Sequence, residues 1–288
     1  MSNFQTLLYY NFVTIQNPEA LMKNHKILCE ELDLKGRVLI SKEGINGTVE
    51  GTVDNTNKYI ETINKGNEFG QIKFKKSLSN GKNFPKMAVK ARDEIVTTGL
   101  PYHEELGPLT GVTGKYITAQ GLNDLINSDQ EFYIIDMRND YEYNVGHFEN
   151  SLIPKALKNF RNLPEILPEI EHLKNKKIIT VCTGGIRCEK ASGFLMYNGF
   201  QDVSQLQDGI VSYMEKYPNK DFLGKLYVFD NRLMMGFNVD SPEHKVVAKC
   251  TICGTKSENM IDYKGPDGNR LHGVVCDLCL QKGKVELD

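Results

Sequence analysis

Cys182 lies where an apolar segment meets a glycine-containing turn, and this junction constrains the fold more than any other feature of the chain. Lys177–Val181 is predicted to form a buried strand, Thr183–Arg187 a tight turn and Cys188–Asn198 a helix. Strands that alternate with helices are typical of α/β structure, in which helices cover a parallel sheet. Because such sheets bind ligands at the carboxyl ends of their strands, Cys182 marks a candidate site.

The turn favours the thiolate form of Cys182. Its backbone N–H groups and the N-terminus of the following helix supply partial positive charge, which lowers the pKa of a thiol. The turn residues are therefore a candidate anion-binding or substrate loop: Thr183, Gly184, Gly185 and Ile186. The candidate catalytic residues are Cys182, Arg187 and Cys188.

Each of these three residues also has a simpler interpretation. A buried cysteine is often an inert packing residue, which applies to Cys182 and Cys188 alike. Alternatively, Cys188 resolves an oxidised Cys182. Arg187 either holds an anion or forms an ion pair with a neighbour such as Glu189. Glycines and an arginine beside Cys182 favour a functional thiolate.

The 288 residues exceed the roughly 100–150 of one typical domain, and three domains are expected. Residues 1–96 follow the order β-α-β-β-α-β, which predicts a ferredoxin-like α+β domain. Residues 97–115 are rich in Gly, Pro and Thr and are expected to form a linker. Residues 116–220 alternate strands with helices and predict a parallel α/β domain, whereas residues 221–288 are cysteine-rich.

A basic strip lies near the end of the first domain, within a chain whose net charge is only −2. Its seven cations are Lys73, Lys75, Lys76, Lys82, Lys86, Lys90 and Arg92. With the nearby aromatic residues Phe74 and Phe84, the strip suits a phosphate backbone and unstacked bases. The alternative is a solvated edge strand whose lysines prevent aggregation.

Two C-x-x-C pairs occupy the C-terminal segment, and 22 residues separate them. The four thiols, Cys250, Cys253, Cys276 and Cys279, predict a structural zinc site, because each pair supplies two tetrahedral ligands from one turn. His272 is a rival ligand, and loosely packed or disulfide-linked cysteines are the alternative. Cys29 follows an amphipathic helical pattern and is expected to be a packing residue.

The N-terminal residues have no basic segment followed by a long apolar stretch, so no secretory signal is expected. No apolar run approaches the roughly 18 residues that a membrane helix needs. We therefore expect a cytoplasmic protein that does not bind a membrane.

The segment Val181–Ala191 (VCTGGIRCEKA) resembles the active-site loop of rhodanese-type sulfurtransferases, in which the cysteine carries a persulfide. The upstream segment also resembles that family's D-x-R, E-Y, G-H and I-P signature. The matching positions are Asp136, Arg138, Glu142, Gly146 and His147. The resemblance implies a rhodanese-like central domain, in which these residues brace the loop without taking part in catalysis.

Three further segments extend the resemblance over nearly the whole chain: Gly36–Gly51, Phe84–Gly99 and the terminal cysteine pairs. Together with the loop, they resemble the bacterial tRNA uridine-34 hydroxylase family (TrhO). This resemblance implies O₂-dependent hydroxylation of the wobble uridine at C5, with Cys182 as the catalytic cysteine. It also implies that the basic strip binds the anticodon stem-loop of tRNA.

The sequence is therefore compatible with three alternative functions: a tRNA hydroxylase, a sulfurtransferase that carries a persulfide, and a non-catalytic scaffold for RNA or protein. The sequence has no G-x-G-x-x-G fingerprint and its six histidines are scattered, so thiolate chemistry is the chemistry that it indicates. Cys182 either attacks C6 of uracil or carries an oxidising sulfur species. The sequence does not identify an electron donor.

Overall fold

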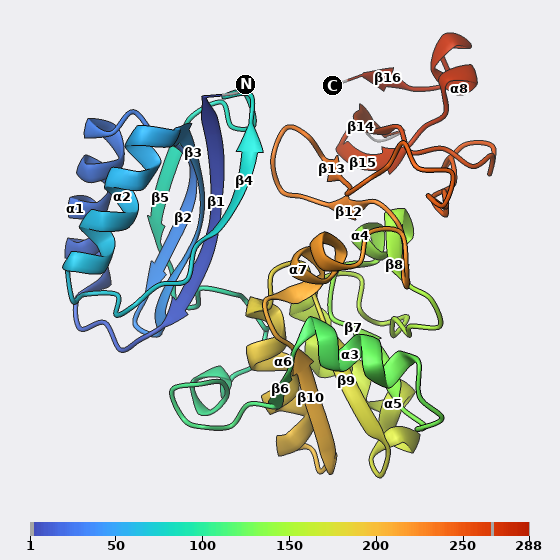
Figure 1. Cartoon of the computed structure of the whole chain (residues 1–288), viewed down its shortest axis with the longest axis horizontal. Coiled ribbons are helices and arrows are strands. Elements are labelled where there is room, and N and C mark those ends of the chain that lie inside the picture. The colour runs from blue at the N-terminus through green and yellow to red at the C-terminus, as the bar shows by residue number, and fades with distance from the viewer. Residues whose placement is uncertain (1–2, 266–267, 288) are drawn as a thin grey trace. The chain divides into compact units, whose positions relative to one another are not determined.

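The computed structural model describes residues 3–265 and 268–287 (Figure 1). The chain divides into two compact units. The first comprises residues 1–98 and 102–112, and the second comprises residues 99–101 and 113–288. The 97–115 segment is thus shared between the two units, and it contains a short 3₁₀ helix, His103–Glu105.

The first unit is a five-stranded sheet with two helices on one face (Figure 1). The strands are β1 (Phe4–Phe12), β2 (Lys35–Ser41), β3 (Gly44–Thr52), β4 (Lys75–Ser79) and β5 (Met87–Ala91), and the helices are α1 (Pro18–Glu31) and α2 (Val53–Lys65). The strand order is β4-β1-β3-β2-β5, and only β2 and β5 pair in parallel. The predicted ferredoxin-like α+β order is confirmed, with β5 added beside β2.

Helix caps explain where both helices of this unit begin. The side chain of Asn17 accepts a hydrogen bond from Ala20 N ahead of Pro18, and the side chain of Thr52 caps α2. Cys29 on α1 is fully buried in the core, as a packing residue should be. Phe74 also packs against this core, and Phe84 is only 8% exposed. Phe84 is therefore an interior residue, whereas Phe74 is only partly buried, and the expectation that aromatic residues of this strip meet RNA bases stays a prediction for Phe74.

The second unit contains a four-stranded sheet in the order β6-β10-β9-β7. Its strands are β6 (Lys115–Ile117), β7 (Tyr133–Asp136), β9 (Lys177–Val181) and β10 (Asp202–Leu206), and every pair is parallel. The helical segments are α3 (Ala119–Ile126), α4 (Asp140–Val145), Phe160–Ile166, α5 (Leu167–Ile170), Glu171–Leu173, α6 (Ile186–Tyr197) and α7 (Gly209–Lys216). The predicted parallel α/β domain is confirmed. However, α6 begins two residues earlier than expected, so Ile186 and Arg187 belong to the helix.

Small antiparallel elements follow this sheet within the same unit. Strand β8 (Gly146–Phe148) pairs with β11 (Phe222–Gly224), and β12 (Leu226–Tyr227) pairs with β13 (Met234–Met235). The remaining elements are β14 (Met260–Lys264), β15 (Arg270–Val274), α8 (Asp277–Gln281) and β16 (Glu286–Leu287), and the strand order is β15-β14-β16. The cysteine-rich segment therefore has a small core of its own around Tyr263 and Val275.

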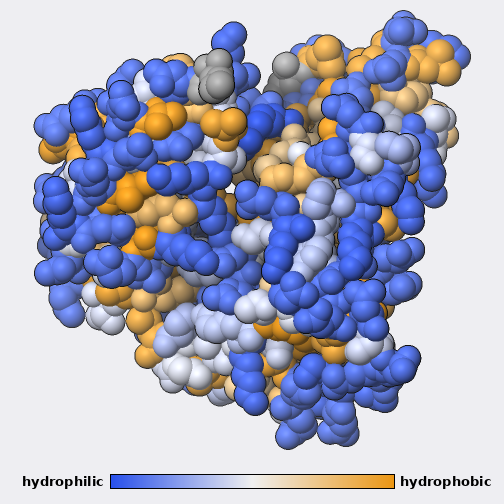
Figure 2. All heavy atoms as spheres, viewed as in Figure 1, coloured by the Kyte–Doolittle hydropathy of each residue, from blue (hydrophilic) through white to orange (hydrophobic). Residues whose placement is uncertain are grey.

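Hydrophilic residues cover most of the face that Figure 2 shows, with hydrophobic side chains scattered between them. Among the described residues, no helix is both long enough and apolar enough to cross a bilayer.

Candidate active site

Cys182 follows the last residue of β9, and its thiol lies beneath the turn that leads into α6. The backbone N–H of Gly185 donates a hydrogen bond to Cys182 Sγ over 3.2 Å. Gly185 caps α6 at φ +105°, a conformation that side chains with a Cβ rarely adopt. Cys182 is completely buried, so a substrate must displace the atoms that cover its sulfur.

The surroundings of Cys182 favour its thiolate form. Burial alone would raise the pKa of Cys182. The thiol of Cys188 and the charge of Arg187 act against burial, together with two backbone N–H groups, and the pKa falls to about 6. At neutral pH this sulfur is therefore largely a thiolate, which is the nucleophilic form of cysteine.

Cys188 lies on the first turn of α6 and is also completely buried. Burial and the adjacent Cys182 sulfur hold the pKa of Cys188 well above its usual range. The two thiols thus differ in protonation state: Cys188 keeps its proton and donates a hydrogen bond toward Cys182. This geometry is compatible with a resolving thiol and with a packing residue alike.

Arg187 does not pair with Glu189. Its guanidinium forms two hydrogen bonds with the carboxylate of Glu142, at 2.6 and 2.8 Å, and a third with Thr183 Oγ1 at 3.2 Å. Glu142 is fully buried on α4, and despite that burial the charge of Arg187 lowers the pKa of its carboxyl. A buried bidentate pair of this kind fixes the guanidinium close to the thiolate.

A second buried ion pair positions α4 itself. Arg138 binds the carboxylate of Asp136 through Nε and Nη2, at 2.9 and 2.7 Å. The same guanidinium donates to the backbone carbonyls of Gly146 at 2.6 Å and Glu142 at 3.3 Å. Both side chains are fully buried. These contacts connect the end of β7 to the helix that supplies the partner of Arg187.

The sequence alone did not identify Gly209 as part of this site. The backbone N–H of Ile210 donates to the carbonyl of Cys182 at 2.9 Å, so the N-terminus of α7 lies directly against the loop. Gly209 has φ +73°, and a Cβ at this position would lie 2.6 Å from Thr183 O and 2.7 Å from Gly184 Cα. The Asp208-Gly209 pair that closely follows the strand-like Val203–Leu206 is the sequence signal for this turn.

The four terminal cysteines converge, as their spacing predicts. The sulfur atoms of Cys250, Cys253, Cys276 and Cys279 all lie within 4.8 Å of one another, and those of Cys253 and Cys276 are 3.6 Å apart. Tetrahedral Zn–S bonds of about 2.3 Å would place ligand sulfurs about 3.8 Å apart. The thiol donor set therefore fits a metal ion. His272 lies outside this cluster, with Nδ1 hydrogen-bonded to Asp262.

The basic strip does not form one continuous surface. Lys73, Lys75 and Lys76 lie on or next to β4, which is one edge strand, and Lys86, Lys90 and Arg92 lie on or next to β5, the opposite edge strand. Four strand spacings separate these edges by about 19 Å. Lys82 lies in the connection between them. The sequence predicted one group of seven cations, and the sheet divides them into two groups of three.

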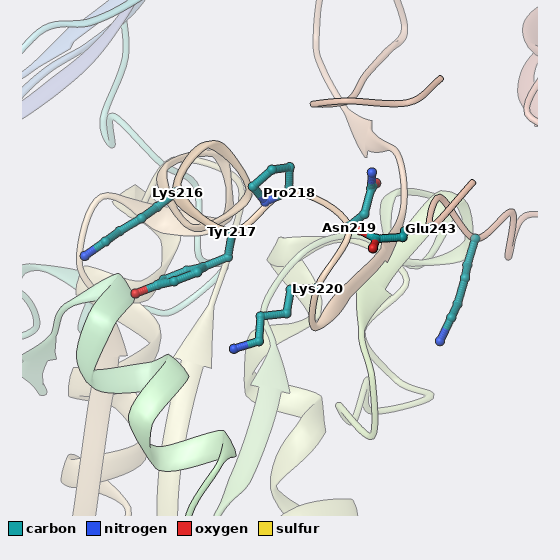
Figure 3. A pocket seen from close by; sticks show the side chains of 7 residues that line it. Lys216, Tyr217, Pro218, Asn219, Lys220 and Glu243 are labelled. Atoms are coloured by element: carbon teal, nitrogen blue, oxygen red, sulfur yellow. The ribbon is translucent and has the colours of Figure 1, made fainter. Parts of the chain in front are cut away.

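A pocket of about 620 Å³ lies at the end of α7 that faces away from the loop (Figure 3). It is lined by Lys216, Tyr217, Pro218, Asn219, Lys220, Glu243 and Lys245. The ammonium groups of Lys216 and Lys220 lie 5.4 and 5.6 Å from the centre of the Tyr217 ring. The length of α7 separates this cationic pocket from Gly209 by about 11 Å, so it is distinct from the thiolate site.

Comparison with known proteins agrees with this architecture. The family models that match are the UPF0176 acylphosphatase-like domain at residues 4–95, the rhodanese-like domain at 118–216 and the "Rhodanase C-terminal" domain at 223–286. The rhodanese-like model therefore contains the Cys182 loop. A solved rhodanese-like domain from an Anabaena protein is 20% identical, and the match covers 39% of this chain and 80% of the Anabaena chain with a TM-score of 0.33.

Relatives match this chain almost from end to end. A Cytophaga hutchinsonii protein named tRNA uridine(34) hydroxylase is 38% identical over 98% of this chain and 88% of its own length. Proteins of the same name from Listeria welshimeri and Enterococcus faecalis are each 42% identical, over 94% and 93% of this chain and 83% of their own lengths. This chain belongs to the tRNA uridine(34) hydroxylase family. The alignment with these relatives covers all three domains that the family models match.

Proposed function

We propose that this protein hydroxylates uridine 34 of tRNA at C5 and produces 5-hydroxyuridine. The observation that carries the proposal is a buried thiolate at Cys182 in a chain that matches tRNA uridine(34) hydroxylases along nearly its full length. The rhodanese-like loop would equally suit a persulfide. However, the full-length relatives carry the hydroxylase name, which favours base hydroxylation over simple sulfur transfer.

In this proposal, Cys182 acts as a covalent catalyst. Its thiolate adds to C6 of uracil, and the electron pair of the C5–C6 double bond moves to C5 and the O4 carbonyl. The resulting enolate is nucleophilic at C5 and attacks O₂ there, and two-electron reduction then breaks the O–O bond and leaves a hydroxyl group on C5. Loss of the C5 proton and breakage of the S–C6 bond restore the double bond and return the thiolate.

The oxygen balance defines the co-substrates. One atom of O₂ becomes the hydroxyl group at C5, and the other leaves as water. Reduction of the second atom consumes two protons and two electrons, so the reaction needs an external two-electron reductant as well as O₂. The residues of the loop supply the nucleophile and its electrostatic support, whereas the reductant has to come from outside the chain.

Arg187 and Cys188 act on the nucleophile in different ways. The positive charge of Arg187 stabilises the thiolate before addition and after elimination. Cys188 keeps its proton and donates a hydrogen bond to the same sulfur. Thr183, Gly184 and Gly185 form the turn that encloses the sulfur, and Ile186 begins α6. Thr183 also binds Arg187.

The other domains serve the same substrate in this proposal. The cations at the edges of the first sheet bind phosphates of the anticodon stem-loop, while unpaired bases enter the cysteine loop. The four terminal cysteines hold a structural Zn²⁺ ion, which fixes the fold of the segment that follows residue 221.

A deletion strain complemented with variants tests the proposal. We expect Cys182→Ser to abolish 5-hydroxyuridine and its derivatives in tRNA, because a serine hydroxyl is not ionised at neutral pH. Nucleoside mass spectrometry provides the measurement. Cys29→Ser is the control, since Cys29 is another fully buried thiol, but in the core of the other unit. Loss of a thiolated base in the deletion strain, with 5-hydroxyuridine intact, would show sulfur transfer instead.

A further inference from the structure

The turn between β12 and β13 presents an aromatic side chain to solvent on a rigid support. Phe229 is 51% exposed. The turn is closed by hydrogen bonds from Val228 N to Leu233 O and from Leu233 N to Asp230 O, both 2.9 Å. Arg232 binds the carboxylate of Asp230 through Nε and Nη2. These contacts hold the turn in one conformation, so little conformational freedom remains to be lost when a ligand binds.

Two further rings fix the orientation of Phe229. Tyr227 meets Phe229 edge to face, with ring centres 5.1 Å apart, and it meets Tyr141 in the same way at 5.1 Å. Tyr227 is buried, and the hydroxyl of Tyr141 accepts a hydrogen bond from Asn139 Nδ2 at 2.7 Å. The three rings therefore form a row from α4 to the surface, and only the outer ring is widely exposed.

The outer ring lies beside the catalytic loop. The Arg187 guanidinium carbon is 6.0 Å from the centre of the Phe229 ring, close enough for a cation–π contact. The same guanidinium binds Glu142 and Thr183 and lowers the pKa of Cys182. A flat ligand on Phe229 would thus lie next to the group that supports the thiolate.

Building on the function proposed above, we propose that Phe229 is the stacking platform for the uracil that is hydroxylated. Proteins that bind single-stranded RNA commonly hold unstacked bases against aromatic rings and arginine planes. Isolated exposed apolar residues are common on protein surfaces. Phe229 differs in its braced turn, its fixed ring and its position beside Arg187. Stacking would hold the base by one face and leave the opposite face of its C5–C6 double bond open to the Cys182 thiolate.

Steady-state kinetics test the platform with a substitution that removes the aromatic ring but keeps an apolar side chain. We expect Phe229→Leu to raise KM for an anticodon stem-loop roughly 5- to 150-fold, because an alkyl side chain cannot stack. Phe229→Tyr should restore KM to nearly the wild-type value. Tyr197→Leu is the control, since Tyr197 is a similarly exposed aromatic residue at the last position of α6, away from the loop. Wild-type kinetics in Phe229→Leu would overturn the inference.

A fluorescence experiment tests stacking without turnover. The chain contains no tryptophan, so Phe229→Trp in a Cys182→Ser background introduces a single reporter. A stem-loop with uridine at position 34 should quench this fluorescence, whereas a stem-loop that is abasic at position 34 should bind without quenching. Equal quenching by both RNAs, or none by either, would overturn the inference.

The two proposals fail separately. If the wild-type protein produces no 5-hydroxyuridine, the proposed reaction is wrong, but quenching that requires the base at position 34 still establishes the platform. If the wild-type protein is active and Phe229→Leu is equally active, the platform is wrong and the reaction stands.

Discussion

At the scale of single residues, the protonation state of Cys182 determines what the site can do. Its pKa of about 6 is well below the ordinary thiol value of about 8.5. The thiolate fraction therefore rises as the pH increases through about 6. We expect the rate at which iodoacetamide alkylates Cys182 to follow this rise and to level off near pH 7, as measured by peptide mass spectrometry. Because the sulfur is buried, opening of the loop sets the plateau of this rate, and the thiolate fraction sets its midpoint.

The neighbouring thiol provides the control for this titration. Cys188→Ala removes the side chain that donates a hydrogen bond to the thiolate, so the midpoint of alkylation should move to higher pH. Cys29 should remain unreactive across the range, because burial raises its pKa to about 12. A wild-type midpoint near pH 8.5 would contradict the electrostatic account of the loop.

At the scale of elements, the site depends on how closely α7 approaches the cysteine loop. Gly209→Ala places a Cβ within 2.6–2.7 Å of backbone atoms of the loop, at φ +73°. We expect this variant to lose stability and hydroxylation together, since the loop has to move. Urea unfolding and nucleoside mass spectrometry measure the two effects.

Gly199→Ala separates the clash from backbone strain. Gly199 has φ +88°, but a Cβ there meets nothing within 4 Å. This variant should lose only the stability that a Cβ at positive φ costs, about 1–2 kcal/mol, and it should keep its activity. If the two variants lose equal stability and equal activity, the approach of α7 has no special role.

The cysteine segment behaves as an element whose fold depends on its ligands. We expect one zinc ion per chain in the purified protein, and loss of that ion in Cys253→Ser, by elemental analysis. Because three of the four thiols belong to the segment's small core, chelation should also make residues 221–288 sensitive to proteolysis. Cys29→Ser should keep its zinc. A zinc-free wild-type protein with a protease-resistant segment would contradict this expectation.

At the scale of the whole molecule, RNA binding should depend on salt through the edge cations of the first sheet. We expect the β4 edge to carry this role, because the ammonium of Lys75 lies 5.6 Å from the Tyr10 ring and joins charge to an aromatic surface. Changing Lys73, Lys75 and Lys76 to Gln should reduce the slope of log K against log salt by about 2 to 3.

Two matched triple variants identify the surface that binds. Neutralising Lys86, Lys90 and Arg92 removes the same charge from the opposite edge, and neutralising Lys216, Lys220 and Lys245 removes it from the pocket at the end of α7. Filter binding at several salt concentrations measures all three. If either comparison variant reduces the salt slope more than the β4 variant does, the RNA contact lies on the surface which that variant neutralises.

Local patterns made much of this molecule predictable. The strand, turn and helix around Cys182 are adjacent in sequence, and each C-x-x-C pair is confined to one turn, so both could be identified before any tertiary structure. The ion pair of Glu142 with Arg187 joins positions 45 residues apart, and spacing favoured Glu189 as the partner. Phe229 carries no sequence signal, because its role depends on which surface its ring meets.

The basic strip shows the limit of reading charge along a chain. Seven cations within a short segment indicated one surface, but β4 and β5, which carry most of them, are the two opposite edge strands of the sheet. Phe74 and Phe84 were likewise assigned to the surface because of their charged neighbours, whereas Phe84 is buried and Phe74 packs partly against the core. Strand order is a tertiary property, and it decides which residues share a surface.

The Glu142–Arg187 pair also has a consequence for the newly synthesised chain. Before β7 and α4 dock against β9 and α6, no buried carboxylate holds Arg187 beside Cys182, and the thiol has an ordinary pKa of about 8.5. Folding itself is then the step that lowers the pKa of Cys182 and makes the thiolate. In a nascent or misfolded copy, only a few per cent of this thiol would be ionised at neutral pH.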